Sequence, residues 1–287
     1  MLGGTSARPP EELANELHEL IDQCDGILAA VGGWSLLPVL PHLNIEYLAS
    51  SLKPIIGYSD LTSLVNLVAF QGGTVSFHGP MVLSEWGEFE APWEYTVRSF
   101  EQVVIREPSS RKVQLLDEAP EWTDELLWWD SGDVRRRNPV EGGEGLRVIR
   151  EGTAIGALWG GSLHVLGLTV GTPYWVPPEN GILCLEAEAI APDEYWARLE
   201  QFRQAGVFEE VAGVVVGKVS RPAATPSGFS DFDVILERVV TRDIPIVAGA
   251  DIGHTEPMVT LPIGAECELT CTRRSCTLEI VDIREAS

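Results

Sequence analysis

A strand-to-helix junction around Ser59 constrains the fold of this chain more than any other stretch. Residues 54–57 form a short apolar run typical of a buried strand, and from Leu61 onward the apolar residues recur at helical spacing. A sharp turn at such a junction lifts a hydroxyl clear of the sheet, and the free N–H groups of the following helix can stabilise an oxyanion. Taken alone, the segment favours a simpler interpretation, in which Ser59 or Asp60 caps the helix.

The same alternation of helix, strand and glycine-rich turn continues along the chain. Residues 5–22 have the capping residues and apolar stripe of a helix, and residues 26–31 form an apolar strand that runs into Gly32-Gly33. Later strands and helices are expected at residues 181–185, 192–205, 211–216, 232–240 and 244–247. This order predicts an α/β fold. The N–H groups of Gly32-Gly33 suit an anion or oxyanion, although such a pair is more often a tight turn.

Residues from about 107 to 152 interrupt this pattern, because they are rich in Pro, Gly, Arg and Trp and show little periodicity. We therefore predict an N-terminal domain at residues 1–106, a linker with surface loops at 107–152, and a C-terminal domain at 153–287.

Three tryptophans in the linker stand close in sequence to the basic run Arg135-Arg136-Arg137; they are Trp122, Trp128 and Trp129. An aromatic platform beside a basic cluster could receive a flat or anionic ligand. A packed loop with solvated arginines explains the same residues equally well.

The composition excludes several classes of partner. With a net charge of −23, the surface would repel nucleic acid and anionic membranes, so we expect neither as a partner. No basic segment followed by an apolar stretch opens the chain, and no run is long enough to span a bilayer, which favours a cytoplasmic protein.

The five cysteines indicate core packing rather than a disulfide framework or a metal site. They include no C-x-x-C pair, and three of them cluster at Cys267, Cys271 and Cys276. These three alternate with polar residues on the two sides of a turn, which predicts a hairpin with thiols on its apolar face. We expect no metal.

Two further polar residues follow predicted strands. Glu186 ends the strand at 181–185, and His254 lies in a glycine-flanked loop after the strand at 244–247. A carboxylate at a strand end can be directed toward a neighbouring histidine, although a surface glutamate that starts a loop is the simpler alternative. His78 is either a loop histidine near a site or a hydrogen-bonded structural one.

Ser59, Glu186 and His254 follow one another in the order Ser, Glu, His, each at a strand end. Together with the flanking sequence words, the chain resembles the LD-carboxypeptidase family of serine peptidases, which includes murein tetrapeptide carboxypeptidases and microcin C immunity carboxypeptidases. The matching words lie at residues 32–35, 57–60, 77–80, 160–163, 183–186, 253–254 and 261–264. They run in consistent order along nearly the whole chain.

The resemblance implies a role for each residue. Ser59 would be the nucleophile, His254 the general base and acid, and Glu186 the group that orients the imidazole. The N–H groups of Asp60 and Gly33 would form the oxyanion hole. It also implies a flavodoxin-like N-terminal domain joined to a β-rich α/β C-terminal domain, a site between the two, no cofactor, and a homodimer.

The chain departs from the family pattern at three places. It opens on the helix that in the family follows a first strand unit, so that unit is expected to be missing unless an earlier start codon supplies it. Ser162 replaces an Asn that commonly follows the glycine pair. No Lys follows Glu186 at the position found in microcin immunity members.

The tryptophan-rich stretch is nevertheless similar to a loop of the microcin immunity branch in which a Trp stacks on the nucleotide base. We therefore place the chain nearer that branch, with Trp128, Trp129 and Ser162 as expected substrate contacts.

The resulting expectation is a serine carboxypeptidase that cleaves an amide next to a terminal carboxylate or an acyl-sulfamate. Its substrate would be a small peptide or an aminoacyl-nucleotide, in peptidoglycan-peptide recycling or in microcin C-type self-immunity. The alternative is a catalytically impaired protein that binds a peptide or nucleotide conjugate. A different serine hydrolase, such as an esterase, is a weaker alternative, because the second glycine of the nucleophile elbow is absent.

Overall fold

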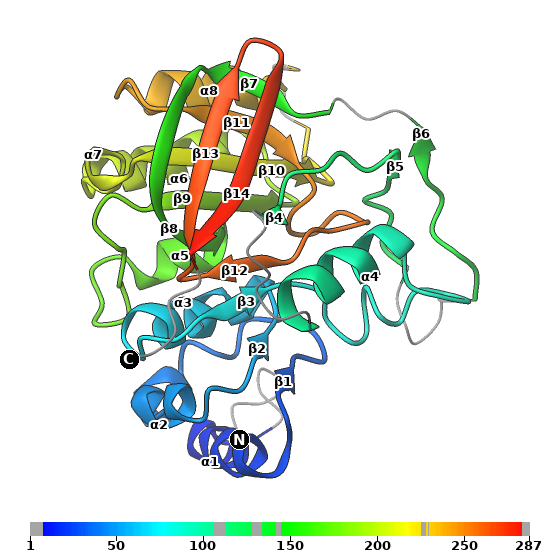
Figure 1. Ribbon diagram of the computed structural model, residues 1–287, viewed down its shortest axis with the longest axis vertical. Helices are drawn as coiled ribbons and strands as arrows, with labels where there is room; N and C mark the ends of the chain where they lie inside the picture. The colour runs from blue at the N-terminus through cyan, green and yellow to red at the C-terminus, as the bar shows by residue number, and fades with distance from the viewer. Residues whose placement is uncertain are drawn as a thin grey trace.

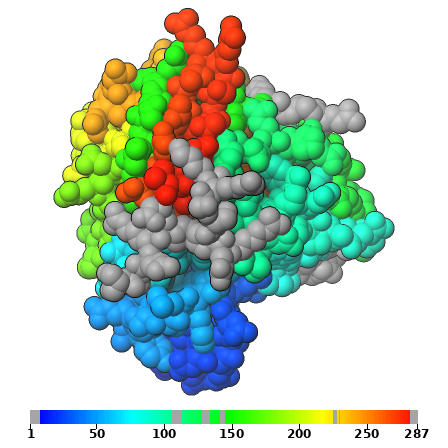
Figure 2. Space-filling view, in the orientation of Figure 1, coloured from blue at the N-terminus to red at the C-terminus, as the bar shows by residue number. Residues whose placement is uncertain are grey.

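The computed structural model describes residues 8–105, 113–127, 134–141, 145–224, 228 and 230–282, so Trp128 and Trp129 lie outside the described residues. The chain forms a mixed α/β fold with two main sheets, as the sequence predicts (Figure 1). In the space-filling view, the N-terminal residues occupy one end of the molecule and the C-terminal hairpin the other (Figure 2). None of the helices in the described ranges is long and apolar enough to cross a membrane.

The smaller sheet has the order β1-β2-β3-β12 and forms the lower half of the molecule in Figure 1. The strands β1 (Ile27–Leu28), β2 (Ile55–Ile56) and β3 (Ser76–His78) are parallel, and β12 (Leu261–Ile263) pairs antiparallel with β3. Three α-helices are connected to these strands: α1 (Pro10–Gln23), α2 (Ile45–Ser50) and α3 (Thr62–Phe70). The last strand of this sheet therefore comes from the C-terminal part of the chain.

The larger sheet has eight strands in the order β4-β14-β13-β8-β9-β10-β11-β7. Its centre is parallel, with β8 (Gly152–Ser162), β9 (Ile182–Glu188), β10 (Gly213–Ser220) and β11 (Ile246–Ala250) side by side. Apolar side chains of β9 and β10 pack against the helices α5 (Leu163–Thr169), α6 (Pro192–Gln204), α7 (Val207–Glu210) and α8 (Phe232–Val239). Ligands of such sheets bind beyond the carboxyl ends of the strands.

The predicted cysteine hairpin is present as β13 (Glu266–Thr272) and β14 (Ser275–Asp282). Cys267, Cys271 and Cys276 are buried in an apolar cluster, and Cys271 lies directly across the hairpin from Cys276. These thiols are core residues, which confirms the interpretation of the alternating pattern.

The described residues of the segment predicted as linker and loops contain four short strands. β4 (Val113–Gln114) and β7 (Arg147–Arg150) pair with the two edges of the larger sheet, and β5 (Glu121–Trp122) pairs with β6 (Val140–Glu141) as a separate ribbon. Between β3 and this segment lie α4 (Glu94–Phe100) and a π-helical turn at Glu101–Ile105.

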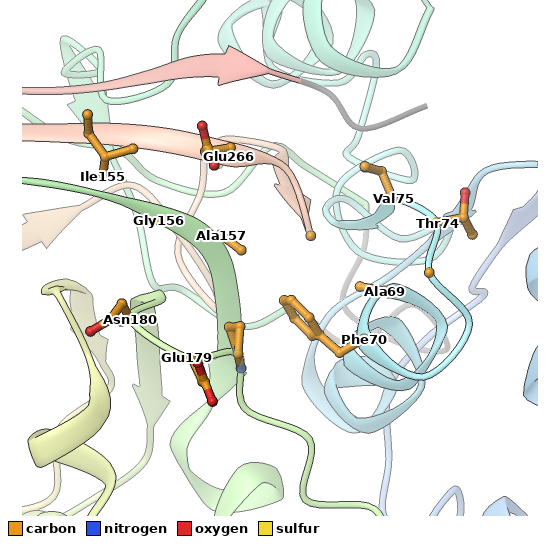
Figure 3. Close-up of a pocket in the computed structure, with 13 residues that line it drawn as sticks. Ala69, Phe70, Thr74, Val75, Ile155, Gly156, Ala157, Glu179, Asn180 and Glu266 are labelled. Carbon is orange, nitrogen blue, oxygen red and sulfur yellow. The ribbon is translucent and has the colours of Figure 1, made fainter. Parts of the chain in front are cut away.

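A cavity of about 440 Å³ opens between the two sheets at the end of α3 that is farther from Ser59. Phe70 points into it from α3, and Ile155 and Ala157 of β8 lie on its other side (Figure 3). None of the predicted catalytic residues lines this cavity.

Candidate active site

Ser59 lies at a sharp turn between β2 and α3, as the sequence predicts. Its φ of 58° is in the left-handed region that residues with a side chain rarely adopt, so the turn stores backbone strain. Gly32, in the loop that follows β1, packs directly on it: a Cβ atom at Gly32 would lie 2.8 Å from Ser59 Oγ. The close approach of these two loops therefore requires glycine at position 32.

The fold brings Ser59, His254 and Glu186 into one hydrogen-bonded chain. His254 Nε2 lies 3.1 Å from Ser59 Oγ, and His254 Nδ1 donates to Glu186 Oε2 at 2.8 Å. Glu186 is almost completely buried on β9, and His254 follows β11. Gly253 has a φ of 85°, and a Cβ atom there would lie 2.5 Å from Glu186 Cβ, so glycine permits this contact.

Asp60 holds the loop that contains Gly32 and Gly33 next to Ser59. Its Oδ2 accepts hydrogen bonds from the backbone N–H groups of Ser35 and Leu36 at 2.8 and 3.0 Å. Burial raises the pKa of Asp60, and the two backbone donors offset only part of that rise. Gly33, with a φ of 153°, lies in the loop that Asp60 holds.

Ser162 is the last residue of β8 and lies opposite Glu186 in the strand register. Its backbone N–H donates to Thr62 Oγ1 at 3.0 Å, which joins the larger sheet to the first turn of α3. One turn further on, the Asn66 side chain donates to Gly160 O and accepts from Gly160 N–H. Thr62 and Asn66 were not predicted, although their spacing of four residues places both on one face of the helix.

A second carboxylate contacts the imidazole and was not predicted. Glu188 Oε1 lies 3.1 Å from His254 Nε2, and Glu188 also pairs with Arg221. Burial would lower the pKa of His254, but Glu186 and Glu188 outweigh it and raise that pKa to about 10. Burial would raise the pKa of Glu188, yet His254 and Arg221 lower it to about 2. The sequence did contain a signal for Glu188: side chains two residues apart on a strand point to the same face, so Glu188 lies on the face of β9 that carries Glu186.

Tyr58 and His78 pack beside the imidazole. The Tyr58 ring meets the His254 ring edge-on, with their centroids 4.8 Å apart. His78 is buried on β3, and neither of its ring nitrogens has a hydrogen-bond partner in the described residues. Burial lowers the pKa of His78 to about 4, so this ring is neutral near pH 7.

Behind Tyr58 lies a buried acidic cluster, formed by Glu85, Glu88 and Glu256 around Arg137. The Tyr58 hydroxyl donates to Glu85 at 2.8 Å, and Arg137 Nε donates to Glu88 at 2.7 Å. Arg137 Nη2 lies 3.3 Å from Glu256 Oε1. The pKa of Glu256 is raised by burial and by Glu85, with Arg137 acting against them.

The other two arginines of the basic run also have partners within the chain. Arg135 pairs with Glu125, and the Arg136 guanidinium lies 4.3 Å from the centre of the Trp93 ring. Trp93 was not among the tryptophans predicted beside this run. Of those three, the centre of the Trp122 ring lies 5.8 Å from Lys218 Nζ, and Trp128 and Trp129 fall outside the described residues, so their contact with the run stays a prediction.

The segment that leads to those tryptophans is attached to the site. Thr123 exchanges backbone hydrogen bonds with Glu256, two residues after His254. Asp124 accepts a hydrogen bond from the Arg221 N–H at 2.7 Å.

The fold and this site define the class of two-domain α/β serine peptidases. Residues 2–79 match the family model for the LD-carboxypeptidase N-terminal domain, and residues 155–269 match the model for the LD-carboxypeptidase C-terminal domain. The chain belongs to the LD-carboxypeptidase family.

A microcin self-immunity protein and a muramoyltetrapeptide carboxypeptidase are both similar to the chain. The microcin C7 self-immunity protein MccF of Escherichia coli is 27% identical over 93% of this chain and 78% of its own length. The structure of MccF in complex with aspartyl sulfamoyl adenosine superposes with a TM-score of 0.82 at 25% identity, covering 95% of this chain and 80% of that one. The muramoyltetrapeptide carboxypeptidase of Oxalobacter formigenes superposes with a TM-score of 0.77 at 25% identity, covering 97% and 87%.

Proposed function

We propose that the protein is a serine carboxypeptidase that hydrolyses an amide bond next to an anionic group, either a terminal carboxylate or an acyl-sulfamate. The observation that carries this proposal is the chain of short contacts from Ser59 through His254 to Glu186, which starts at a strained turn. A serine hydroxyl, an imidazole and a buried carboxylate in this order form an acyl-transfer triad.

The mechanism follows from the positions of these groups. Ser59 Oγ attacks the carbonyl carbon of the substrate while its proton passes to His254 Nε2. Glu186 stabilises the resulting imidazolium, and the backbone N–H groups of Asp60 and Gly33 receive the oxyanion. The leaving amine takes the proton from Nε2, and water then cleaves the acyl-enzyme by the same route.

Two substrate classes are compatible with the family. One is a muramoyl tetrapeptide, the substrate that the name of the Oxalobacter relative gives for that protein. The other is an aminoacyl-nucleotide, of the kind bound in the MccF structure. We favour the second class, with Trp128, Trp129 and Ser162 as substrate contacts, and a cytoplasmic homodimer as the working form.

A second candidate function is that of a binding protein with impaired turnover. The observation that favours it is the contact between Glu188 and His254 Nε2, because a proton held there cannot be exchanged for that of Ser59. A serine-directed fluorophosphonate separates the two functions, since it reacts only with an activated Ser59.

Release of D-alanine from a D-Ala-terminated tetrapeptide, and of sulfamoyl adenosine from aspartyl sulfamoyl adenosine, tests the proposed function. The protein and its Ser59→Ala variant are assayed on both substrates, with circular dichroism as the check on folding. We expect release from at least one substrate and a loss of several orders of magnitude in the variant. Equal activity in the variant would end the assignment of Ser59. Absence of release and of labelling in the folded parent protein would favour the binding protein.

A further inference from the structure

Two strand ends beside His254 hold a glutamate and an arginine to which the mechanism above gives no role. Glu188 is the last residue of β9, and it lies opposite Ser220, the last residue of β10. The next residue on each strand has an unusual backbone: φ is 48° at Ala189 and 45° at Arg221. Neither is glycine, and strain of this kind is typical of functional sites.

Arg221 is held from one side and open on the other. Its backbone N–H donates to Asp124 Oδ2 at 2.7 Å, and its Nη1 donates to the carbonyl of the same residue at 3.1 Å. Its Nη2 donates to Glu188, and the side chain is 28% exposed. A guanidinium fixed in this way presents a planar pair of donors suited to a carboxylate or a sulfamate.

A single carboxylate group separates this guanidinium from the catalytic imidazole. Glu188 contacts His254 Nε2 with Oε1 and Arg221 with Oε2, while Ser59 Oγ lies 3.1 Å from the same Nε2. In a substrate whose carbonyl carbon is at Ser59, the leaving nitrogen must reach Nε2. Arg221 is the guanidinium on the far side of Glu188 from Nε2, so it is available to an anionic group attached beyond that nitrogen.

We infer that Arg221 receives the anionic group of the substrate, and that the Glu188 carboxylate occupies this place until the substrate displaces it. This inference rests on the proposed function and assigns the residue that recognises the anion. A terminal carboxylate and an acyl-sulfamate share the required chemistry, which is a negative charge next to the scissile amide.

Displacement of Glu188 also frees the base. The Glu188 side chain is 35% exposed at a strand end, so it can turn toward solvent. Among the residues that the structure describes, the other groups that face His254 are Glu186, Ser59, the neutral His78 and the Tyr58 ring. With Glu188 gone, His254 loses one of the two carboxylates that hold its proton, and Nε2 can accept the proton of Ser59.

The first test compares an acid substrate with its amide. We would measure kcat/KM on a tetrapeptide ending in D-alanine, on the same peptide ending in D-alaninamide, and on aspartyl sulfamoyl adenosine. The variants are Arg221→Gly, which suits the positive φ, and Arg221→Lys, which keeps the charge. The control is Arg203→Gln, whose guanidinium pairs with Glu200 on the surface of α6.

We expect the parent protein to prefer the acid over the amide by about 100-fold, the scale of a charged hydrogen-bonded pair. Arg221→Gly should remove this preference by losing activity on the acid, and Arg221→Lys should retain part of it. The source of the anion is the substrate, peptide or nucleotide conjugate, that the parent protein cleaves and on which Arg221→Gly loses about 100-fold in kcat/KM. An equal loss on acid and amide, or none, would overturn the assignment of Arg221.

The second test follows labelling of Ser59 by an uncharged fluorophosphonate at pH 7, which requires no anion site. Glu188→Gln should be labelled about tenfold faster than the parent, whereas Glu200→Gln, which alters another arginine-paired carboxylate, should not change. Unchanged or slower labelling of Glu188→Gln would overturn the inference that Glu188 occupies the anion site in the absence of substrate. If no protein is cleaved or labelled in a Ser59-dependent way, the proposed function fails, and the inference fails with it.

Discussion

Asn66 of α3 and Gly160 of β8 form a reciprocal pair of hydrogen bonds that joins the helix after Ser59 to the larger sheet. The Asn66 amide donates to Gly160 O at 2.8 Å and accepts from Gly160 N–H at 3.0 Å. Both groups are buried, and the pair lies one helical turn from the site. The relative position of Ser59 and Glu186 thus depends on an amide side chain that touches neither.

Replacement of Asn66 by Ala should therefore cost both stability and activity. It leaves the N–H and C=O of Gly160 without partners in a buried place, and we expect the free energy of unfolding to fall by about 3 kcal/mol. Urea denaturation measures this loss. Asn44→Ala, which removes only the cap of α2, should cost about 1 kcal/mol and leave kcat/KM unchanged. A smaller loss at Asn66 than at Asn44 would contradict the coupling.

Gly32→Ala should abolish most of the activity while the protein stays folded. The added methyl group would lie 2.7 Å from Ser59 Cβ, so the loop or the serine must shift. A displacement of this kind costs about 100-fold in kcat/KM. Gly73→Ala is the matched control, because its methyl group would meet nothing within 4 Å although its φ is positive. Full activity of Gly32→Ala would show that the loop can shift to make room for the methyl group without disturbing Ser59.

The rate of Ser59 labelling should rise with pH toward about 10 in the parent protein. His254 must be neutral to act as a base, and Glu186 and Glu188 raise its pKa to about 10 against the effect of burial. Glu188→Gln should shift the rise of the labelling rate to lower pH. Since the folded-state pKa lies above the ordinary value of 6.5, this interaction stabilises the fold fully below pH 6.5 and is lost as the pH rises through about 10. If the labelling rate rises at the same pH in both proteins, Glu188 does not contribute to the raised pKa of His254.

Arg137→Gln should destabilise the protein increasingly as the pH rises. The pKa of Glu88 is lowered because Arg137 outweighs burial, so this carboxylate adds stability above its ordinary pKa and loses it as the pH falls. Without Arg137, buried Glu88 and Glu256 favour protonation in the folded state. We expect a loss of about 3 kcal/mol near pH 7 and a smaller one near pH 4, measured by thermal unfolding. Arg135→Gln, at the exposed pair with Glu125, should change little.

Local patterns were sufficient to place Ser59 and His254 after strands. The change from an apolar run to helical spacing located the turn at Ser59, and the apolar run at residues 244–247 located the loop of His254. The predicted strand end at Glu186 was wrong, because β9 continues for two more residues, to Glu188. The convergence of the three residues was not derivable from spacing, because it depends on the two sheets meeting. The family resemblance supplied it, and the distances in the fold agree with it.

The residues that the sequence analysis missed act across long separations. Arg221 gains its place from Asp124, 97 residues earlier, and no local pattern indicates that contact. β4 and β7 have two and four residues, too few to show a period, so they read as loops until a sheet edge pairs with them. Glu188 is an exception among the missed residues, because its spacing of two from Glu186 already placed both side chains on the same face of a strand.

The pairing of β12 with β3 has a consequence for synthesis of the protein on the ribosome. Leu261 lies opposite His78, so the outer edge of β3 has no partner until residues 261–263 have emerged. During most of translation the first sheet presents an open strand edge, which is the kind of surface that pairs with other chains. The N-terminal half can therefore complete its sheet only after nearly the whole chain has been made. Fragments that stop before β12 should expose that edge and aggregate.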